Sequence, residues 1–428
     1  MDSITKTLSK IEYLHISILG FGLAALSTSL AQIILPIRIL DISPDQLKNT
    51  YLGILTFSGM SVAMLTQPVV GYLSDRTSLG LGRRKPYILG GAILSTTLTL
   101  SLGVASSYIL IVIVYIFIQV GINVAQNPYD AMVKDQVPHN QRGQVSATRA
   151  ISGGAGAITL VLLTGLLMDN HLNGLQDKWL WISLIIPSFT LCFTMVWILT
   201  KVDDGFLKQQ PEPQNQGNRE ETNMPHPHFY VFLVAGFFFT LAAGILQTYT
   251  LFFLTDVVKL DNPASAIGIL AAVVGATILI TLYPAGLLSD RLGRSQLLIV
   301  SGIKGSICSL LLCFSQNLTH VLLIGILMGV SIGVFMSAGR ALITDLASKS
   351  QTATHLGIAN LVLVGGLAVS KLGGIAIDSL NNIQVDLGYY VLLGISSASF
   401  AIGTVLVSIL NKKVGTNFKE ISHSSIDA

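Results

Sequence analysis

The stretch GYLSDRTSLGLGRRKP, Gly71 to Pro86, is matched later in the chain by GLLSDRLGRSQ, Gly286 to Gln296. The two leading glycines lie 215 residues apart in a chain of 428, which is half its length to within one residue. Both copies follow apolar runs and carry charges of both signs. A charged phrase that recurs at half the chain length predicts two copies of one structural unit.

The composition predicts that both units lie in a membrane. Hydrophobic residues make up 51% of the chain, charged residues only 11%, and the mean hydropathy is +0.67. A soluble domain carries about 25% charged residues. The apolar residues here also come in runs of roughly 20, the length that spans a bilayer as a helix. We therefore predict an all-α integral membrane protein whose surface contacts the lipid bilayer.

Twelve membrane spans are predicted, six on each side of a polar stretch. They are 11–35, 50–75, 86–104, 109–134, 144–168, 178–200, 228–254, 264–289, 295–314, 320–346, 354–379 and 388–410. Residues 201–227 are rich in Pro, Gln, Asn and Glu, a composition that predicts a linker. The expected domains are an N-terminal six-helix bundle (1–200), the linker (201–227), a C-terminal six-helix bundle (228–410) and a tail (411–428).

Basic residues are distributed unevenly between alternate loops. If the N-terminus is cytoplasmic, seventeen of the 25 Lys and Arg residues fall in cytoplasmic segments and four in outer segments. Short loops that are rich in Lys and Arg stay in the cytoplasm. We therefore expect a multi-pass protein of the cell (plasma or inner) membrane, with both termini in the cytoplasm.

The internal repeat extends beyond the opening phrase. When Ala131 is aligned with Ala341, Asp135 falls on Asp345, and Asp130 falls on Arg340. Two six-span repeats in the same orientation are the arrangement of major facilitator transporters.

Each copy of the phrase is predicted to lie where an even-numbered span meets the cytoplasm. A positive-inside anchor would account for Arg83, Arg84 and Lys85. It does not account for Asp75 and Asp290 at the membrane edge, each four residues after a glycine. A carboxylate at such a place can cap a neighbouring helix N-terminus, where the helix dipole favours negative charge. A contact of this kind, formed in one conformation and broken in the other, would act as a latch in a protein that alternates between two states.

The phrase resembles the loop motif of the major facilitator superfamily, Gly-x-x-x-Asp-Arg-x-Gly-Arg. The second copy matches it without insertion at Gly286, Asp290, Arg291, Gly293 and Arg294. The first copy matches it with four extra residues at Gly71, Asp75, Arg76, Gly82, Arg83 and Arg84. The longer form, DRTSLGLGRRKPY, resembles the sucrose-type and glycoside–pentoside–hexuronide:cation branch of that superfamily.

The resemblance implies two six-helix bundles with matching cytoplasmic latches. By resemblance, Asp75 would reach the start of span eleven, and Asp290 the start of span five. The stretch DQVPHNQRG resembles the family's loop after span four, so that Asp135 and Arg142 would join this network. Asp345 would take the corresponding place in the second half.

Five polar side chains share one face of span four: Gln119, Asn123, Gln126, Asn127 and Asp130. Polar side chains are unfavourable where a helix faces lipid. This face of span four is therefore expected to contact either a polar cavity or a neighbouring helix. By resemblance, spans one, four, seven and ten line the central cavity. The other candidate cavity residues are Gln32, Gln247, Tyr249 and Arg340. Amides and hydroxyls suit a polyhydroxylated ligand, and the Tyr249 ring could cover a sugar face.

Several charges fall inside predicted spans. Asp130 and Arg340 could form a structural ion pair or an inner gate, or Asp130 could carry the proton that drives transport. Lys371, seven residues before Asp378, either faces an outer cavity or extends to the membrane surface. Lys304 and Arg149 are expected to extend to the membrane surface or to lie at the interface rather than to act in function.

Spans one and two carry no internal carboxylate, although cation-coupled members of the sugar branch commonly use acids there. Sodium coupling is therefore weakly supported, proton coupling depends on Asp130, and facilitated diffusion stays open. The sequence contains no nucleotide-binding loop, no zinc-type cluster and no nucleophile arrangement. We expect no enzyme activity, no cofactor, no metal site and no nucleic-acid partner, and we expect a monomer.

The sequence thus predicts a secondary active transporter that moves a sugar, glycoside or similar small polar organic solute by alternating access, with a proton as the coupling ion. Two alternatives remain. One is a drug-type exporter of the same fold, whose cavity would be apolar and aromatic. The other is a non-transporting, lipid- or pigment-binding assembly factor.

Overall fold

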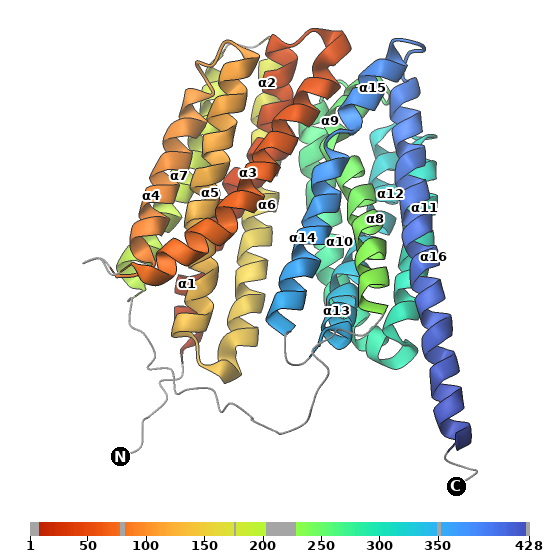
Figure 1. Ribbon diagram of the computed structural model, residues 1–428. Coiled ribbons are helices and arrows are strands. Elements are labelled where there is room, and N and C mark those ends of the chain that lie inside the picture. Colours follow the sequence, from red (N-terminus) through yellow and green to blue (C-terminus); the bar gives the residue numbers. More distant parts are fainter. Residues whose placement is uncertain (1–7, 78–81, 175–176, 203–227, 349–351, 425–428) are drawn as a thin grey trace, which may run out of the picture. The chain divides into compact units, whose positions relative to one another are not determined.

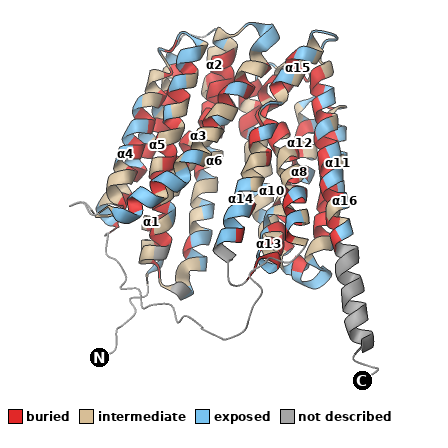
Figure 2. Ribbon diagram, viewed as in Figure 1, coloured by how far each residue is buried: buried red, intermediate tan, exposed pale blue. Residues whose placement is uncertain are grey.

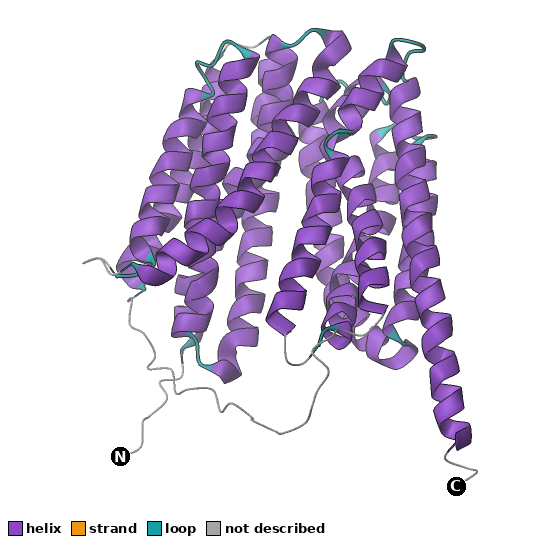
Figure 3. Cartoon of the chain, viewed as in Figure 1, coloured by secondary structure: helices purple, strands orange, loops and turns teal. Residues whose placement is uncertain are grey.

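The computed structural model describes residues 8–77, 82–174, 177–202, 228–348 and 352–424 (Figure 1). Every regular element in these ranges is a helix (Figure 3), which confirms the all-α prediction. The predicted linker, 201–227, lies outside the described residues except for Lys201 and Val202.

The first six predicted spans correspond to helices before the linker. These are α1 (Lys10–Ser29), the π-turn η1 (Leu30–Ile34), α2 (Leu35–Ile42), η2 (Asp45–Leu47), α3 (Lys48–Arg76), α4 (Lys85–Ser101), α5 (Tyr108–Gln136), η3 (His139–Gln141), α6 (Arg142–Leu172) and α7 (Lys178–Lys201).

The other six predicted spans correspond to helices after the linker. These are α8 (His228–Thr248), α9 (Thr250–Asp256), α10 (Pro263–Leu292), α11 (Arg294–Leu312), α12 (Leu318–Val334), the π-turn η4 (Phe335–Gly339), α13 (Arg340–Leu346), α14 (Thr352–Ser370), α15 (Gly373–Asn381) and α16 (Leu387–Ser424). Part of the predicted tail, 411–428, therefore continues the last helix.

Eleven helical segments within the described ranges are long and apolar enough to cross a membrane. The remaining predicted span, 86–104, corresponds to α4, which has 17 residues. At 1.5 Å per residue α4 is about 26 Å long, close to the roughly 30 Å thickness of the hydrocarbon core. Each of the twelve predicted spans thus has a helical counterpart.

The chain forms two compact units. Unit 1 comprises Met1–Gln216 and Asp261–Ala272, and unit 2 comprises Gly217–Leu260 and Val273–Ala428. In unit 1, α1 packs against α6 and α7, and α4 packs against α5 and α7. In unit 2, α8 packs against α14 and α16, and α11 packs against α12 and α16. The first, third, fourth, fifth and sixth spans of each half therefore pack in the same pattern, which confirms the internal repeat.

Buried and exposed residues alternate along the helices of both units (Figure 2). Many exposed side chains are large and apolar: Leu65 is 72% exposed and Phe189 is 68% exposed in unit 1, and Ile280 is 74% exposed in unit 2. Side chains of this kind would be costly in water, and lipid covers them in a membrane-spanning protein.

The beginning of α10 packs within unit 1, whereas the predicted domain boundary assigned it to the C-terminal bundle. Asp169, near the end of α6, is 5% exposed and accepts hydrogen bonds from the backbone N of Ala264 (2.9 Å) and Ser265 (2.8 Å), and from the Ser265 hydroxyl. A Cβ added at Gly165 would lie 2.4 Å from the carbonyl oxygen of Ala264. The capping carboxylate and this close approach hold the start of α10 against α6.

Replacing the capping carboxylate should destabilise the protein. Asp169→Ala leaves two α10 amides without their acceptor, which we expect to cost about 1–3 kcal/mol and to lower the melting temperature by a few degrees. Asp177 is a matched control, because it precedes α7 as its N-cap residue but makes no capping hydrogen bond. Thermal unfolding of the purified variants checks this, and equal shifts for Asp169→Ala and Asp177→Ala would contradict it.

Candidate functional site

The first copy of the repeated phrase forms an ion-pair cluster at one end of unit 1. Arg84 is 5% exposed, and its guanidinium contacts Asp75 (2.8 Å), Asp135 (2.9 Å) and the Ser74 hydroxyl (2.7 Å). Arg83 also contacts Asp135, at 3.0 Å. A buried cation requires such partners, so the cluster connects the adjacent ends of α3, α4 and α5.

The second copy forms the same contact in unit 2. Arg294 pairs with the carboxylate of Asp345, donates to the carbonyl oxygen of Ala341 (2.7 Å), and lies 3.8 Å from Asp290. Asp345 thus takes the place of Asp135, as the alignment of the two halves predicts, and Arg294 corresponds to Arg83, which also follows the motif glycine and pairs with that aspartate.

The motif glycine before each arginine has a backbone role. Gly82 has φ of 97° and Gly293 has φ of 93°. Residues with a Cβ rarely adopt this conformation, so glycine permits the turn into α4 and α11. The glycines four residues before the motif aspartates differ: a Cβ at Gly71 would meet open space, and one at Gly286 would lie 3.4 Å from the Ser337 hydroxyl.

The other predicted latch residues have local contacts. The guanidinium of Arg76 lies 4.1 Å from the ring centre of Tyr72. The Nε of Arg142 donates to the carbonyl oxygen of Val137 at 3.2 Å. Arg291 is exposed. The expected reach of Asp75 to span eleven and of Asp290 to span five stays a prediction.

The polar stripe of span four divides into two sets, and the first set joins helices. Gln119 donates to the Tyr115 hydroxyl (2.6 Å), and Asn123 donates to the carbonyl oxygen of Gln119 (2.8 Å). Gln67 of α3 donates to the Asn123 side chain (3.3 Å) and accepts from Asn127 through its backbone oxygen (3.2 Å). Gln119, Asn123 and Asn127 therefore satisfy one another and α3.

The second set, Gln126 and Asp130, meets an arginine of span five. The Gln126 amide donates to Asp130 Oδ1 at 2.8 Å, and the same carboxylate oxygen pairs with Arg149 of α6. The side chain of Arg149 is only 15% exposed. The sequence assigned Arg149 no partner, whereas the structure pairs it with the carboxylate of Asp130 inside unit 1.

A tyrosine lies beneath this ion pair. The guanidinium of Arg149 lies 3.9 Å from the ring centre of Tyr129, a cation–π distance. Tyr129 is 1% exposed, and its hydroxyl donates to the carbonyl oxygen of Ser17 (3.1 Å) and accepts from the backbone N of Gly20 (3.2 Å). Tyr129 thus fixes Arg149 relative to α1.

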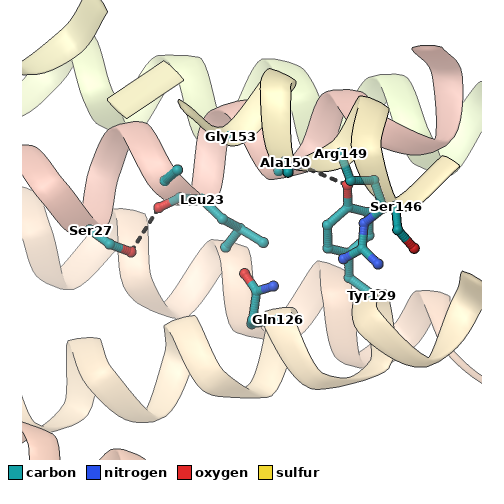
Figure 4. Close-up of a pocket in the computed structure, with 10 residues that line it drawn as sticks. Leu23, Ser27, Gln126, Tyr129, Ser146, Arg149, Ala150 and Gly153 are labelled. Carbon is teal, nitrogen blue, oxygen red and sulfur yellow. Dashed lines mark hydrogen bonds between the residues drawn. The ribbon is translucent and has the colours of Figure 1, made fainter. Parts of the chain in front are cut away.

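Gln126, Tyr129 and Arg149 line a cavity of about 320 Å³ between α1, α5 and α6 (Figure 4). Tyr129 and Arg149 lie together at one end, Ser27 lies at the other, and Gln126 projects from α5 toward α1. The full lining is Gly20, Leu23, Ala24, Ser27, Gln126, Tyr129, Ser146, Arg149, Ala150 and Gly153. The small side chains of this lining on α1 and α6 leave room for the cavity. The cavity volume is in the range of small-molecule binding sites.

The cavity offers several hydrogen-bonding groups to a ligand. The Nε of Arg149 is buried and has no hydrogen-bond partner among the described atoms. This nitrogen is enclosed by protein atoms, so the groups open to a ligand are the other polar groups of the lining. Ser27 donates to the carbonyl oxygen of Leu23 and retains its acceptor capacity. The arrangement suits a small ligand that is rich in oxygen.

The other predicted cavity residues lie elsewhere. Gln32 is half-buried in η1, and Gln247 and Arg340 are exposed at the ends of α8 and α13. Tyr249 is 3% exposed, and its hydroxyl bonds the backbone of Lys371 and Gly374, so its ring is not free to cover a sugar.

Arg149 and Tyr129 were missed from the sequence, although one signal was present. Asp130 lies six residues before the end of α5, and Arg149 lies seven residues after the start of α6. Two successive antiparallel spans place such residues at the same depth, so opposite charges there indicate an ion pair.

Comparison with known proteins identifies the family. The model of the MFS/sugar transport protein family matches residues 18–379. The chain belongs to this family. The resemblance based on the repeated phrase is thereby confirmed, and the chain is a multi-pass membrane transporter of small molecules rather than an enzyme.

Sequence relatives of this MFS/sugar transport family member have mixed descriptions. An uncharacterised MFS-type transporter of Methanocaldococcus jannaschii is 25% identical over 354 residues, which are 80% of this chain and 83% of the relative. The multidrug resistance protein MdtG of Yersinia enterocolitica is 22% identical over 347 residues, 80% of this chain and 81% of the relative.

Solved structures of two transporters share the fold. The nucleoside transporter NupG superposes with a TM-score of 0.73 at 12% identity, covering 93% of this chain and 99% of its own. A D-xylose-proton symporter superposes with a TM-score of 0.73 at 13% identity, covering 93% of this chain and 97% of its own. At such low identity these structures establish the fold and not the substrate.

Removing the central arginine of the loop cluster should weaken unit 1. Arg84→Gln removes one of the two arginines that pair with Asp135, whose side chain is 11% exposed, and we expect the free energy of unfolding to fall by about 1–3 kcal/mol. The Asp75 contact contributes little to this fall, because that carboxylate is 61% exposed. Arg76→Gln, which removes only an aromatic contact, is the control. Thermal unfolding of both variants checks this, and an equal or larger loss for Arg76→Gln would contradict it.

Proposed function

We propose that the chain is a secondary active transporter of a sugar, glycoside or similar small polar organic solute, and that Asp130 couples transport to protons. The observation that carries this proposal is the Asp130–Arg149 ion pair beside the polar cavity between α1, α5 and α6. A charged pair within membrane spans is costly, and such pairs mark substrate and proton pathways.

The lining of the cavity supports an oxygen-rich solute. Gln126, Ser27 and Ser146 offer amide and hydroxyl groups, and Arg149 adds a positively charged guanidinium to the lining. Such groups can form hydrogen bonds with several hydroxyls of one solute, whereas the cavity of a drug-type exporter would need a larger apolar and aromatic surface. The multidrug resistance relatives support an exporter as the second candidate.

Coupling follows from competition for Arg149. When Asp130 is ionised, its carboxylate holds the Arg149 guanidinium and the Gln126 amide. A proton on Asp130 weakens both contacts and frees these donors for the oxygens of a solute. Proton and solute therefore favour each other's binding, and this reciprocity is the requirement for symport.

The proposal includes the topology expected from the loops. The ends that carry the Arg84 and Arg294 clusters would face the cytoplasm of the cell, together with both termini, and the chain would act as a monomer. The distribution of seventeen against four basic residues supports this orientation.

Replacing Asp130, the proposed proton carrier, with a neutral residue should stop proton-driven sugar accumulation without stopping sugar exchange. In proteoliposomes with a panel of radiolabelled sugars, we expect an inward proton gradient to drive accumulation by the wild type. Asp130→Asn should abolish accumulation but retain sugar exchange, because the amide mimics the protonated acid. The control is Asn127→Ala, whose side chain bonds α3 outside the cavity. Gradient-driven accumulation by Asp130→Asn would exclude Asp130 from coupling, and absence of any sugar movement in the wild type would contradict the solute class.

Replacing the cavity arginine should affect solute binding. Arg149→Lys keeps the charge but loses the planar fork and its contact with Tyr129, so we expect KM for the transported sugar to rise about tenfold or more. Initial uptake rates over a concentration series measure KM. An unchanged KM in Arg149→Lys would show that the solute binds elsewhere.

A further inference from the structure

Spans seven and eleven are interrupted side by side in unit 2. Span seven breaks at Tyr249, between α8 and α9, and span eleven breaks after Ser370, between α14 and α15. The Tyr249 hydroxyl joins the two breaks, because it donates to the carbonyl oxygen of Lys371 and accepts from the backbone N of Gly374 at 2.6 Å. Non-helical backbone within a membrane is tolerated where protein groups satisfy it or where it lines a cavity.

Lys371 occupies the break in span eleven. Its Nζ donates to the Thr248 hydroxyl at 2.6 Å, and that hydroxyl donates to the carbonyl oxygen of Gly244 at 2.6 Å. Within the described part of the chain, Lys371 makes no other side-chain hydrogen bond and no ion pair. Because an ammonium has three donors, two N–H groups have no acceptor in the described protein.

The position of Lys371 argues against extension to the membrane surface. The residue lies ten positions before Asn381, the end of α15. The nine residues of α15, about 14 Å of helix, separate Lys371 from that end of span eleven, whereas lysines that extend to the surface lie near the ends of a span. Its Nζ is also bound to α8 rather than directed along span eleven.

The carboxylates on the neighbouring elements do not form an ion pair with this ammonium. Asp256 at the end of α9 accepts a hydrogen bond from the Tyr389 hydroxyl at 2.6 Å. Asp378 on α15 is 4% exposed, and it makes no ion pair with Lys371 among the described atoms. A positive charge in a membrane span with a single hydroxyl partner is unfavourable unless an anion joins it.

We propose that Lys371 and Thr248 form a binding site within unit 2 for an anionic group, the carboxylate of a sugar acid or the phosphate of a phosphorylated sugar. The inference goes beyond the proposed function, because it assigns a second site, in unit 2, in addition to the cavity of unit 1. An anion at this position would accept the two free N–H groups of Lys371, and the Thr248 hydroxyl would keep the ammonium in place.

The test measures ligand binding rather than transport. Wild-type protein in lipid nanodiscs is heated with D-glucuronate, D-gluconate, D-glucose 6-phosphate or neutral D-glucose at constant ionic strength, and the melting temperature reports binding. The variants are Lys371→Gln, Lys371→Arg and Thr248→Val. Lys304→Gln is the control, because it removes another span lysine of the same unit.

We expect at least one anionic sugar to stabilise the wild type at concentrations where D-glucose does not. Its affinity should fall about tenfold to a hundredfold in Lys371→Gln, the loss of one charged hydrogen-bonding partner. Lys371→Arg should retain much of the affinity, Thr248→Val should lose part of it, and Lys304→Gln should behave as the wild type. If Lys371→Gln does not fold, Thr248→Val decides the matter, and an unchanged affinity in Thr248→Val would overturn the inference.

Other outcomes separate this inference from the proposed function. Equal stabilisation by D-glucose and by the anionic sugars, unchanged in Lys371→Gln, would overturn the inference and leave the sugar transporter intact. Stabilisation by no member of the panel would contradict both. Nanodiscs with and without phosphatidylglycerol test the remaining source of an anion. A Lys371-dependent stabilisation by this lipid, with none by the sugars, would show that lipid phosphate occupies the position and would overturn a solute site.

Discussion

A charge inside a membrane-spanning bundle needs a partner within the protein, and the structure depends on this constraint. Arg84 meets Asp75 and Asp135, and Arg149 meets Asp130. Each of these ion pairs joins different spans, so the requirement for compensation also fixes how the helices are arranged. The repeated phrase recurs at half the chain length because each unit needs an arginine–aspartate cluster at the same end.

The same constraint connects the fold to function. A pair that is fully compensated and inaccessible stabilises a bundle, whereas a pair beside a cavity can exchange its partner for a ligand. The cavity beside Asp130 and Arg149 meets this second condition, since Asp130 is 52% exposed and Arg149 lines the space. Lys371 extends the argument to unit 2, where the charge has a hydroxyl partner and no carboxylate within the described residues.

Patterns of hydropathy and repetition predicted the twelve spans, the duplication and the correspondence of Asp135 with Asp345. They could not predict the rotation of each helix, which decides the partner of each polar side chain. For this reason the stripe of span four was treated as one face, although Asn127 bonds Gln67 of α3 and Gln126 faces the cavity. The break at Tyr249 was missed for a related reason, since the hydrogen bonds that permit it come from a span more than a hundred residues later.

The central claim is that the cavity between α1, α5 and α6 holds the transported solute. Alkylation of single cysteines tests it most directly, after the three native cysteines are replaced by serine. In this background, Ser27→Cys and Ser146→Cys report on opposite ends of the cavity, and Thr200→Cys, near the end of α7, is the control. The account predicts that a transported sugar slows alkylation at both cavity positions but not at position 200. A sugar that is transported yet leaves both cavity rates unchanged would contradict it.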